Sequence, residues 1–175
     1  GPDGAYSPAM RSFIAGVLAR AGEICAFTNP VPGSYARFGS FEAPRYVAWS
    51  HQNRSQLIRI PAAPAPEYAR IEVRMPDVSC NPYLAFALLL AAGFEGMERK
   101  MELAEETPYD LYTANAGALE ALPASLEEAI ARAGGSAFVE KVLSADTARK
   151  YLALKQAEQN RWFAARDKEK YQDEA

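Results

Sequence analysis

The first hydrophobic pattern in the chain has a helical period. Between residues 7 and 27, apolar side chains recur every three or four positions, as on one face of an α-helix. Ser7 suits the N-cap of such a helix, and Pro8 suits its first turn. The prolines and glycine of residues 28–33 predict where the helix ends, with a long loop to follow. The pattern therefore predicts an amphipathic helix over residues 7–27.

The period changes to two in the next part of the chain. β-branched and aromatic residues alternate with polar ones in three stretches, Arg45–Ser50, Ser55–Pro61 and Ala69–Met75. Residues 51–53 are predicted to form a tight connection between the first two. These patterns favour three strands in a small antiparallel sheet.

The third stretch has one charged face and one apolar face. Successive side chains of a strand point to opposite sides, so Arg70, Glu72 and Arg74 share a face at about 7 Å spacing. Arg59 takes the equivalent polar position in the second stretch, between Ile58 and Ile60. From the residues alone, a structural ladder of ion pairs is the favoured interpretation of this row, because cross-strand charge pairs are common.

The helical period returns after residue 81. Residues 83–100 are apolar nearly all round at first and polar at the end, which predicts a central helix buried against the sheet. Residues 102–124 lack periodicity and are predicted to be an irregular surface segment. Ser125 and Glu128 have capping-box spacing at the start of another helix that Gly134 and Gly135 end. Helices are predicted over residues 137–143 and about 146–170, the second packed through Trp162 and Phe163.

These elements indicate an α+β fold in which helices cover a small sheet. We divide the 175 residues into a sheet and core helix (about 1–101), the irregular segment (about 102–124) and a helical C-terminal region (about 125–175). Half of the residues are apolar, enough for a hydrophobic core in a domain of this length.

Composition and charge narrow the expected partners. The net charge of −3 gives no reason to expect nucleic acid or an anionic membrane. No apolar run approaches the roughly 20 residues that span a bilayer, and the first residues lack a signal pattern, so we expect a cytoplasmic protein. Cys25 and Cys80 are predicted to be reduced thiols in or near the core, and His51, the only histidine, to be a turn residue rather than a ligand.

The basic residues cluster between Ser34 and Arg74. This stretch combines several arginines with isolated glutamates, a composition that suits a phosphorylated, anionic ligand. Phosphoryl transfer places negative charge on phosphate oxygens, which guanidinium groups and a carboxylate-held metal ion stabilise. A local cationic pocket is therefore the candidate site.

Several motifs in this region, taken in order, resemble one known family. They are TNPVPGSYARF, FEAPRYVAWS, NRSQLIRIPAA, RIEVRMPD, NPYLAFALLLAAG and SLEEA. Together they are similar to the C-terminal part of the catalytic domain of prokaryotic-type glutamine synthetase. Several ordered motifs are far more specific than one short pattern.

The resemblance implies a role for each charged residue of the stretch. It implies that Arg37 contacts glutamate, and that Glu42 lies on a flap that closes over γ-glutamyl phosphate and helps to deprotonate ammonium. Arg54 resembles the arginine on the transferring phosphate, which touches both glutamate and ATP. With Glu42 it makes up the implied catalytic pair.

The remaining implied contacts concern the nucleotide and its metal. Arg59 and Arg70 resemble ATP-site residues, and Glu72 resembles a ligand of the Mg²⁺ or Mn²⁺ that bridges the ATP phosphates. Arg74 resembles a residue that holds substrate carboxylate or phosphate. Tyr109 occupies the place of the family's regulatory nucleotidylated tyrosine, although an ordinary exposed tyrosine is the favoured interpretation.

The resemblance also implies that this chain is part of a larger enzyme. The family's N-terminal domain and its other metal-binding residues precede the matched region, and its active sites form between subunits of ring-shaped homo-oligomers. We expect the parent protein to join glutamate and ammonia with ATP, and the isolated chain to be inactive. A γ-glutamyl-amine (polyamine) ligase and a non-catalytic assembly or regulatory relative remain the alternatives.

Overall fold

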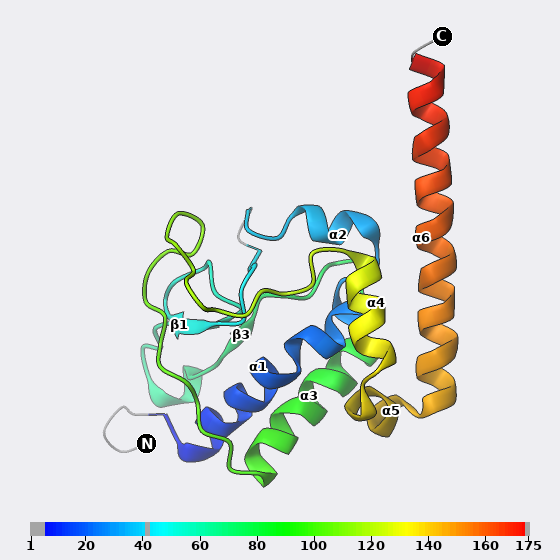
Figure 1. The fold of residues 1–175 in the computed structure, drawn as a ribbon. Helices are drawn as coiled ribbons and strands as arrows, with labels where there is room; N and C mark the ends of the chain where they lie inside the picture. Colours follow the sequence, from blue (N-terminus) through cyan, green and yellow to red (C-terminus); the bar gives the residue numbers. More distant parts are fainter. Residues whose placement is uncertain (1–5, 41–42, 174–175) are drawn as a thin grey trace.

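The computed structural model describes residues 6–40 and 43–173, which form a helix-rich fold with one small sheet (Figure 1). In chain order the elements are α1 (Pro8–Thr28), α2 (Pro32–Ala36), β1 (Trp49–His51), β2 (Ile58–Ile60), a 3-10 turn (Pro66–Tyr68), β3 (Glu72–Val73), α3 (Pro82–Glu98), α4 (Leu126–Gly134), α5 (Ala137–Leu143) and α6 (Ala145–Asp173). The predicted α+β class, with a small sheet and covering helices, is confirmed.

Helix α1 begins and ends within one residue of the predicted bounds, 7–27. The backbone N–H of Met10 donates to Ser7 Oγ at 3.2 Å, and Pro8 occupies the first turn. The helix ends at Thr28, before Asn29 and Pro30. The long loop predicted after it is interrupted, because Pro32 begins the short helix α2, where a proline without an N–H is tolerated in the first turn.

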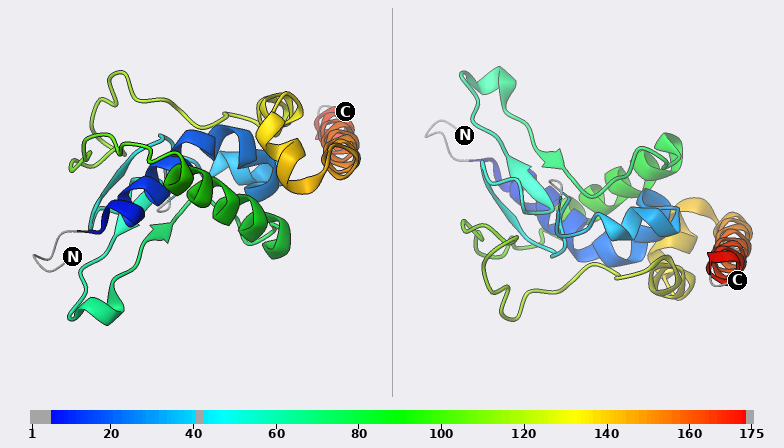
Figure 2. Two further views of the ribbon diagram at one scale, coloured as in Figure 1. Left: turned by 90° about the horizontal axis from the view of Figure 1, so that it is seen from below. Right: turned by 90° about the horizontal axis from the view of Figure 1, so that it is seen from above.

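Helices α1 and α3 lie side by side with their backbones in direct contact (Figures 1 and 2). A Cβ on Gly16 would overlap the carbonyl oxygen of Ala92, and a Cβ on Gly96 would overlap that of Ser12. Beside this contact, Arg20 Nε lies 2.8 Å from Glu95 Oε2. Glycine at the crossing therefore sets how closely the two helices approach.

Helix α3 is only partly buried, although its sequence predicted a buried helix. Its Leu88 and Ala92 side packs into the core, but the opposite side is an apolar stripe open to solvent. The exposed residues are Tyr83, Phe86, Leu90, Phe94 and Met97. The prediction was wrong because hydrophobic periodicity reports which faces are apolar, whereas the neighbouring elements decide which faces are covered.

The sheet has the order β1-β2-β3 and is mixed. Strands β2 and β3 are antiparallel, as predicted, but β1 and β2 are parallel with Trp49 opposite Ile58. The predicted tight connection at residues 51–53 is also wrong, because His51 still belongs to β1. The chain turns at Gln52, whose φ is 62°, and residues 52–57 carry it back beside the start of β1.

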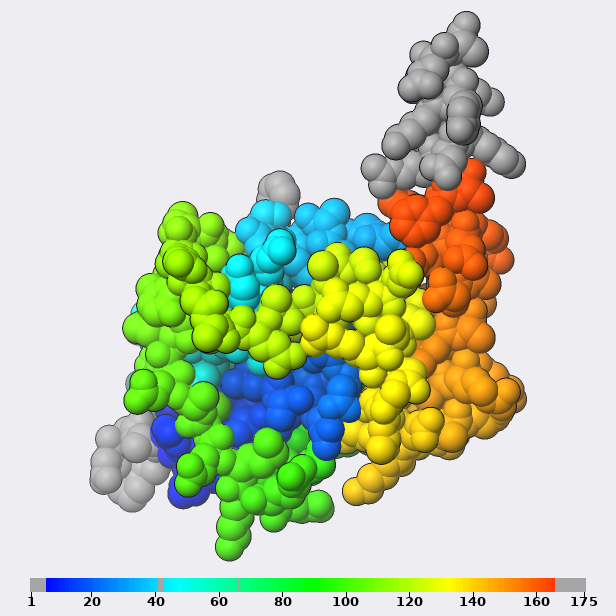
Figure 3. All heavy atoms as spheres, in the orientation of Figure 1, coloured from blue at the N-terminus to red at the C-terminus, as the bar shows by residue number. Residues whose placement is uncertain are grey.

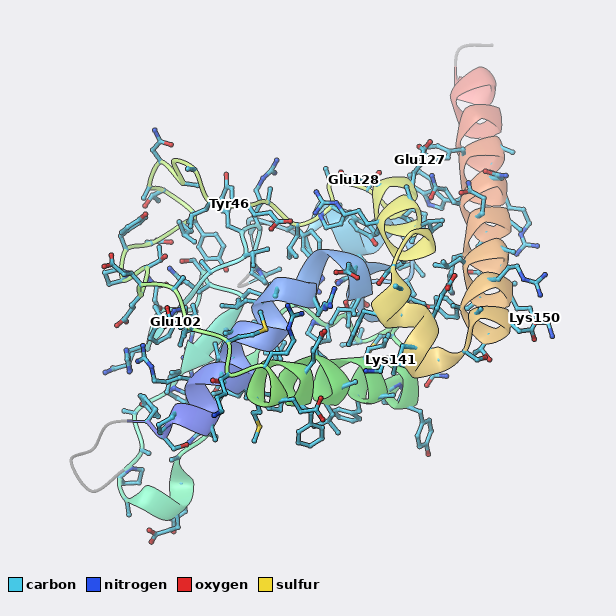
Figure 4. The ribbon with its side chains drawn as sticks, turned by 60° about the horizontal axis from the view of Figure 1, so that its bottom comes forward. Tyr46, Glu102, Glu127, Glu128, Lys141 and Lys150 are labelled. Atoms are coloured by element: carbon cyan, nitrogen blue, oxygen red, sulfur yellow. The ribbon has the colours of Figure 1, made fainter. Side chains whose placement is uncertain are left out.

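The segment between α3 and α4 is irregular, as predicted. In Figure 3 it forms the left side of the body and runs as a band across the front to α4. An isolated bridge joins Ala121 to Tyr46, which Figure 4 places among the loops far from α6. This segment therefore packs along the sheet end of the molecule.

The C-terminal helices follow the predicted order. Ser125 Oγ accepts the N–H of Glu128 at 3.1 Å and caps α4. Helix α6 stands at the side of the body, and Lys150 points outward from it (Figure 4). Trp162 and Phe163 were predicted to be packing anchors, but their exposed fractions are 39% and 47%, and their rings contact each other edge to face.

Cys25 is buried and Cys80 is half-buried, and both are free thiols, as predicted; burial raises the pKa of Cys25 to about 12. Among the helices that the structure describes, none combines the length and apolar character needed to span a bilayer.

Candidate active site

The centre of the candidate site is the pair formed by Arg59 and Glu72. The antiparallel register of β2 and β3 places these residues opposite each other. Arg59 Nε lies 2.8 Å from Glu72 Oε2, and Arg59 Nη2 donates to Oε1 at 3.0 Å. This arginine, first through its hydrogen bond and then through its charge, holds the pKa of Glu72 below its usual value. Glu72 is therefore a carboxylate at neutral pH.

Two further arginines flank the Glu72 carboxylate. Arg70 Nη2 lies 3.9 Å from Oε1, and Arg74 Nη1 lies 3.7 Å from Oε2. The predicted charged face is confirmed, and Met75 on the other face is buried in the core. Three guanidinium groups around one carboxylate leave a net charge of +2. A cluster with a net positive charge attracts a polyanion, whereas a single ion pair has no net charge to do so.

Arg54 is joined to this cluster through its backbone. Arg74 Nε donates to the carbonyl oxygen of Arg54 at 3.0 Å. The backbone N–H of Arg74 also donates to the carbonyl oxygen of Leu57 at 2.8 Å. The loop of residues 52–57 is thus attached to the chain that leaves β3, and the structure brings Arg54 to the edge of the arginine cluster.

Arg37 lies in a different environment from the other predicted site residues. Its Nη2 donates to Asn29 Oδ1 at 2.8 Å and to the carbonyl oxygen of Met75 at 2.5 Å, and its Nε lies 3.3 Å from Asp77 Oδ2. These contacts tie the end of α1 to the chain beyond β3. Arg37 therefore has a clear structural role, next to the backbone that carries Arg74.

The described residues hold only part of what a metal site needs. Glu42, the predicted flap residue, lies outside the described residues. Within residues 6–40 and 43–173, no three His, Cys, Asp or Glu side chains are grouped as a metal site. Divalent Mg²⁺ needs several oxygen ligands. Glu72 has the right chemistry to supply one of them, but the described part of the chain does not supply a full set.

Sequence patterns missed a group of buried polar residues beside the arginine cluster. Ser55 and Gln56 are buried, with exposed fractions of 1% and 0%, although they are the first residues of a predicted strand. Both bond to the segment after α3. The only signal for them was two polar residues directly before an apolar run, which is too weak to distinguish a buried network from an ordinary strand start.

The fold and site together define a class of domain, one in which helices accompany a small sheet that carries a cluster of arginines around one glutamate. The family model "Glutamine synthetase, catalytic domain" matches residues 1–173, and the chain belongs to this family. It is 43% identical over 158 residues to the glutamine synthetase of Methanosarcina mazei, covering 87% of this chain and 35% of that protein. The match to the Thermotoga maritima glutamine synthetase is 45% over 130 residues, covering 71% and 29%.

Solved structures give the same result at the level of the fold. The structure "GmaS/ADP complex-Conformation 1" superimposes with a TM-score of 0.77 at 28% sequence identity. That match covers 92% of this chain and 37% of the other. The chain therefore spans about a third of the length of the relatives that it matches.

Proposed function

We propose that this chain forms the C-terminal part of the active site of an ATP-dependent ligase that amidates the γ-carboxyl group of glutamate with ammonia. The observation that carries the proposal is the cluster of Arg59, Arg70 and Arg74 around Glu72, next to the loop of Arg54. Membership of the glutamine synthetase family supports this assignment, and so does the similarity of the fold to that of a GmaS/ADP complex.

The proposed reaction has two steps. The γ-phosphoryl group of ATP passes to a γ-carboxylate oxygen of glutamate, which gives ADP and γ-glutamyl phosphate. The nitrogen of ammonia then attacks the acyl carbon, the C–N bond forms, and phosphate leaves with the electrons of the broken C–O bond. Negative charge moves between phosphate oxygens in both steps, so preorganised cations are the main source of stabilisation.

In this proposal the arginines bind the negatively charged groups of ATP and glutamate. Arg59 and Arg70 bind the nucleotide phosphates, Arg54 binds the phosphoryl group in transfer, and Arg74 binds substrate carboxylate or phosphate. Arg59 and Arg74 are held in place by Glu72, which lowers the rotational freedom of their guanidinium groups. Preorganisation of this kind reduces the cost of orienting the groups during the reaction.

The roles of the other predicted residues rest on the resemblance. Glu72 would supply one oxygen ligand to Mg²⁺ or Mn²⁺, which when bound neutralises charge on the ATP phosphates. Glu42 is proposed to close over the acyl phosphate and accept a proton from ammonium. Arg37 is proposed to contact glutamate, beside its structural contacts to Asn29 and Asp77.

The remaining parts of the active site are proposed to come from outside residues 1–175. These are the rest of the catalytic domain and neighbouring subunits of a ring-shaped homo-oligomer, in the cytoplasm. The isolated chain is accordingly expected to have no ligase activity, since Glu72 is the one carboxylate that we assign to the metal site and a divalent ion needs several oxygen ligands.

The test is product analysis with the full-length protein. With ATP, Mg²⁺, glutamate and ammonium, we expect ADP and glutamine in equal amounts, and a loss of roughly 100-fold or more in kcat for Arg54→Gln. Arg149→Gln is the matched control, because that side chain is 75% exposed on α6. If product forms with another amine but not with ammonium, that amine is the acceptor instead. If no nucleotide is turned over with any amine, the proposal is overturned.

A further inference from the structure

A segment after α3 is attached closely to β1 and the loop that follows it. We define this segment, residues 104–112, as the strap. At its start, Trp49 Nε1 donates to the carbonyl oxygen of Ala104 at 2.9 Å, and the N–H of Thr107 donates to the carbonyl oxygen of Trp49 at 3.0 Å. Glu106 accepts the backbone N–H of His51 at 2.7 Å. The strap is therefore fixed along β1, from its first residue to its last.

The middle of the strap is held by the amide of Gln56. Gln56 is fully buried, and its Nε2 donates to the carbonyl oxygens of Thr107 and Tyr109 at 2.7 and 2.9 Å. Both hydrogens of the amide nitrogen are thus used on the strap. A buried bond of this kind is costly to remove, because the carbonyl oxygens would be left without a donor.

The end of the strap is held by Ser55 and by the backbone of Arg54. Ser55 Oγ accepts the N–H of Leu111 at 2.9 Å and also lies 2.9 Å from Gln56 Oε1. The hydroxyl of Tyr112 donates to the carbonyl oxygen of Arg54 at 3.3 Å. The same carbonyl oxygen accepts from Arg74 Nε, so the backbone of Arg54 is held from two sides.

We propose that the strap positions Arg54 for the reaction, with Gln56 as the positioning residue that couples the two. This inference rests on the proposed function of Arg54. Residues 52–57 contain no helix or strand of their own, so their backbone geometry depends on these bonds to the strap and to Arg74. A displacement of about 1 Å in a reacting group costs roughly 100-fold in rate, so a small movement of this loop is sufficient to affect catalysis.

The kinetic test replaces the amide with an apolar group of similar length. In the full-length protein, Gln56→Met is expected to lower kcat by about 10- to 100-fold while KM for glutamate changes by less than about threefold. The matched control is Gln159→Met, which changes a side chain of similar burial on α6 and is expected to leave kcat unchanged. A loss that is equal in both variants would assign Gln56 a general structural role and overturn the proposal.

A double-mutant cycle separates positioning of Arg54 from other effects. If Gln56 acts through Arg54, the variant Arg54→Ala/Gln56→Met has the same kcat as Arg54→Ala alone, within about twofold. Losses that multiply would show that Gln56 acts elsewhere and would contradict the inference.

Hydrogen exchange gives a readout that does not depend on the reaction. In the full-length protein, Gln56→Met is expected to speed exchange of the amides of residues 54–56 by about tenfold or more, with exchange in α1 unchanged. Unchanged exchange in this loop would overturn the inference even if the ligase activity is present. Faster exchange in the variant, together with a wild-type protein that lacks ligase activity, would instead overturn the proposed function while leaving the attachment of the strap intact.

Discussion

Arg59 holds the carboxylate of Glu72 on the neighbouring strand through two of its nitrogen atoms, at 2.8 and 3.0 Å. The contact joins β2 to β3 and fixes the guanidinium plane of Arg59 at the centre of the arginine cluster. A planar fork of this kind depends on arginine, because lysine has a single charged nitrogen that cannot contact both oxygens in the same way.

Substitution of Arg59 by lysine tests this geometry. In the full-length protein, Arg59→Lys keeps the charge and loses the fork, so we expect KM for ATP to rise by about tenfold and the free energy of unfolding to fall by only about 1 kcal/mol. Steady-state kinetics and chemical denaturation measure the two quantities. Arg99→Lys is the control, since Arg99 pairs with Glu95 at 3.3 Å and its side chain is 62% exposed. An unchanged KM would remove Arg59 from the nucleotide site.

Arg37 is expected to affect stability more than the other arginines of the site. Arg37→Gln removes contacts to Asn29, Met75 and Asp77 that join α1 to the chain beyond β3. Hydrogen bonds to charged groups contribute about 1.5–3 kcal/mol, so we expect a loss of about 2 kcal/mol and a fall in Tm of roughly 4–8 °C. Thermal unfolding measures this. Arg70→Gln, at a side chain that is 53% exposed, should change Tm by less than about 2 °C, and equal effects would contradict the assignment.

The contact between α1 and α3 predicts a second effect on stability. Alanine is a better helix former than glycine by about 1 kcal/mol, but a Cβ on Gly96 would overlap the carbonyl oxygen of Ser12. We expect the overlap to outweigh the propensity, so that Gly96→Ala lowers the free energy of unfolding by about 1–3 kcal/mol. Urea denaturation is the measurement. Gly33→Ala, where a Cβ has no heavy atom within 4 Å, should be neutral or stabilising, and the same result at both glycines would refute the close contact.

Glu106 predicts a pH dependence for the attachment of the strap. The N–H of His51, and then the His51 side chain, hold the pKa of Glu106 below its usual value of 4.5. Because the pKa in the folded state is depressed, its contribution to stability is present above about pH 4.5 and is lost as the pH falls through the folded value. Glu106→Gln removes this contribution but keeps the shape of the side chain. The stability difference between wild type and Glu106→Gln should therefore shrink below pH 4.5 in denaturation curves, and a constant difference from about pH 3 to pH 7 would contradict the assignment.

The helices were well predicted because their signals are local. Ser7, Ser125 and the glycines at the end of α4 act within one turn, and their effect does not depend on distant parts of the chain. The strands were less well predicted. Strand pairing depends on which segments meet in space, and nothing in residues 52–57 specifies that β1 and β2 run parallel.

The apolar pattern of α3 shows the same limit. The sequence determined that this helix is apolar on most of its faces, but only α1 and the rest of the core decided which face is buried. The glycines that allow close contact were visible in the sequence, whereas the partner atoms opposite them were not.

For the candidate site, the sequence by itself determined that Arg70, Glu72 and Arg74 share one face, because side chains alternate along any strand. It also placed Arg54 and Arg59 in motifs that resemble those of one family. Only the tertiary structure decided that Arg59 faces Glu72. It also decided that Arg37 contacts Asn29 and Asp77, and that Gln56 donates hydrogen bonds to the strap. Most of these contacts join residues far apart in the chain, and their geometry follows from strand register and packing, which no local pattern encodes.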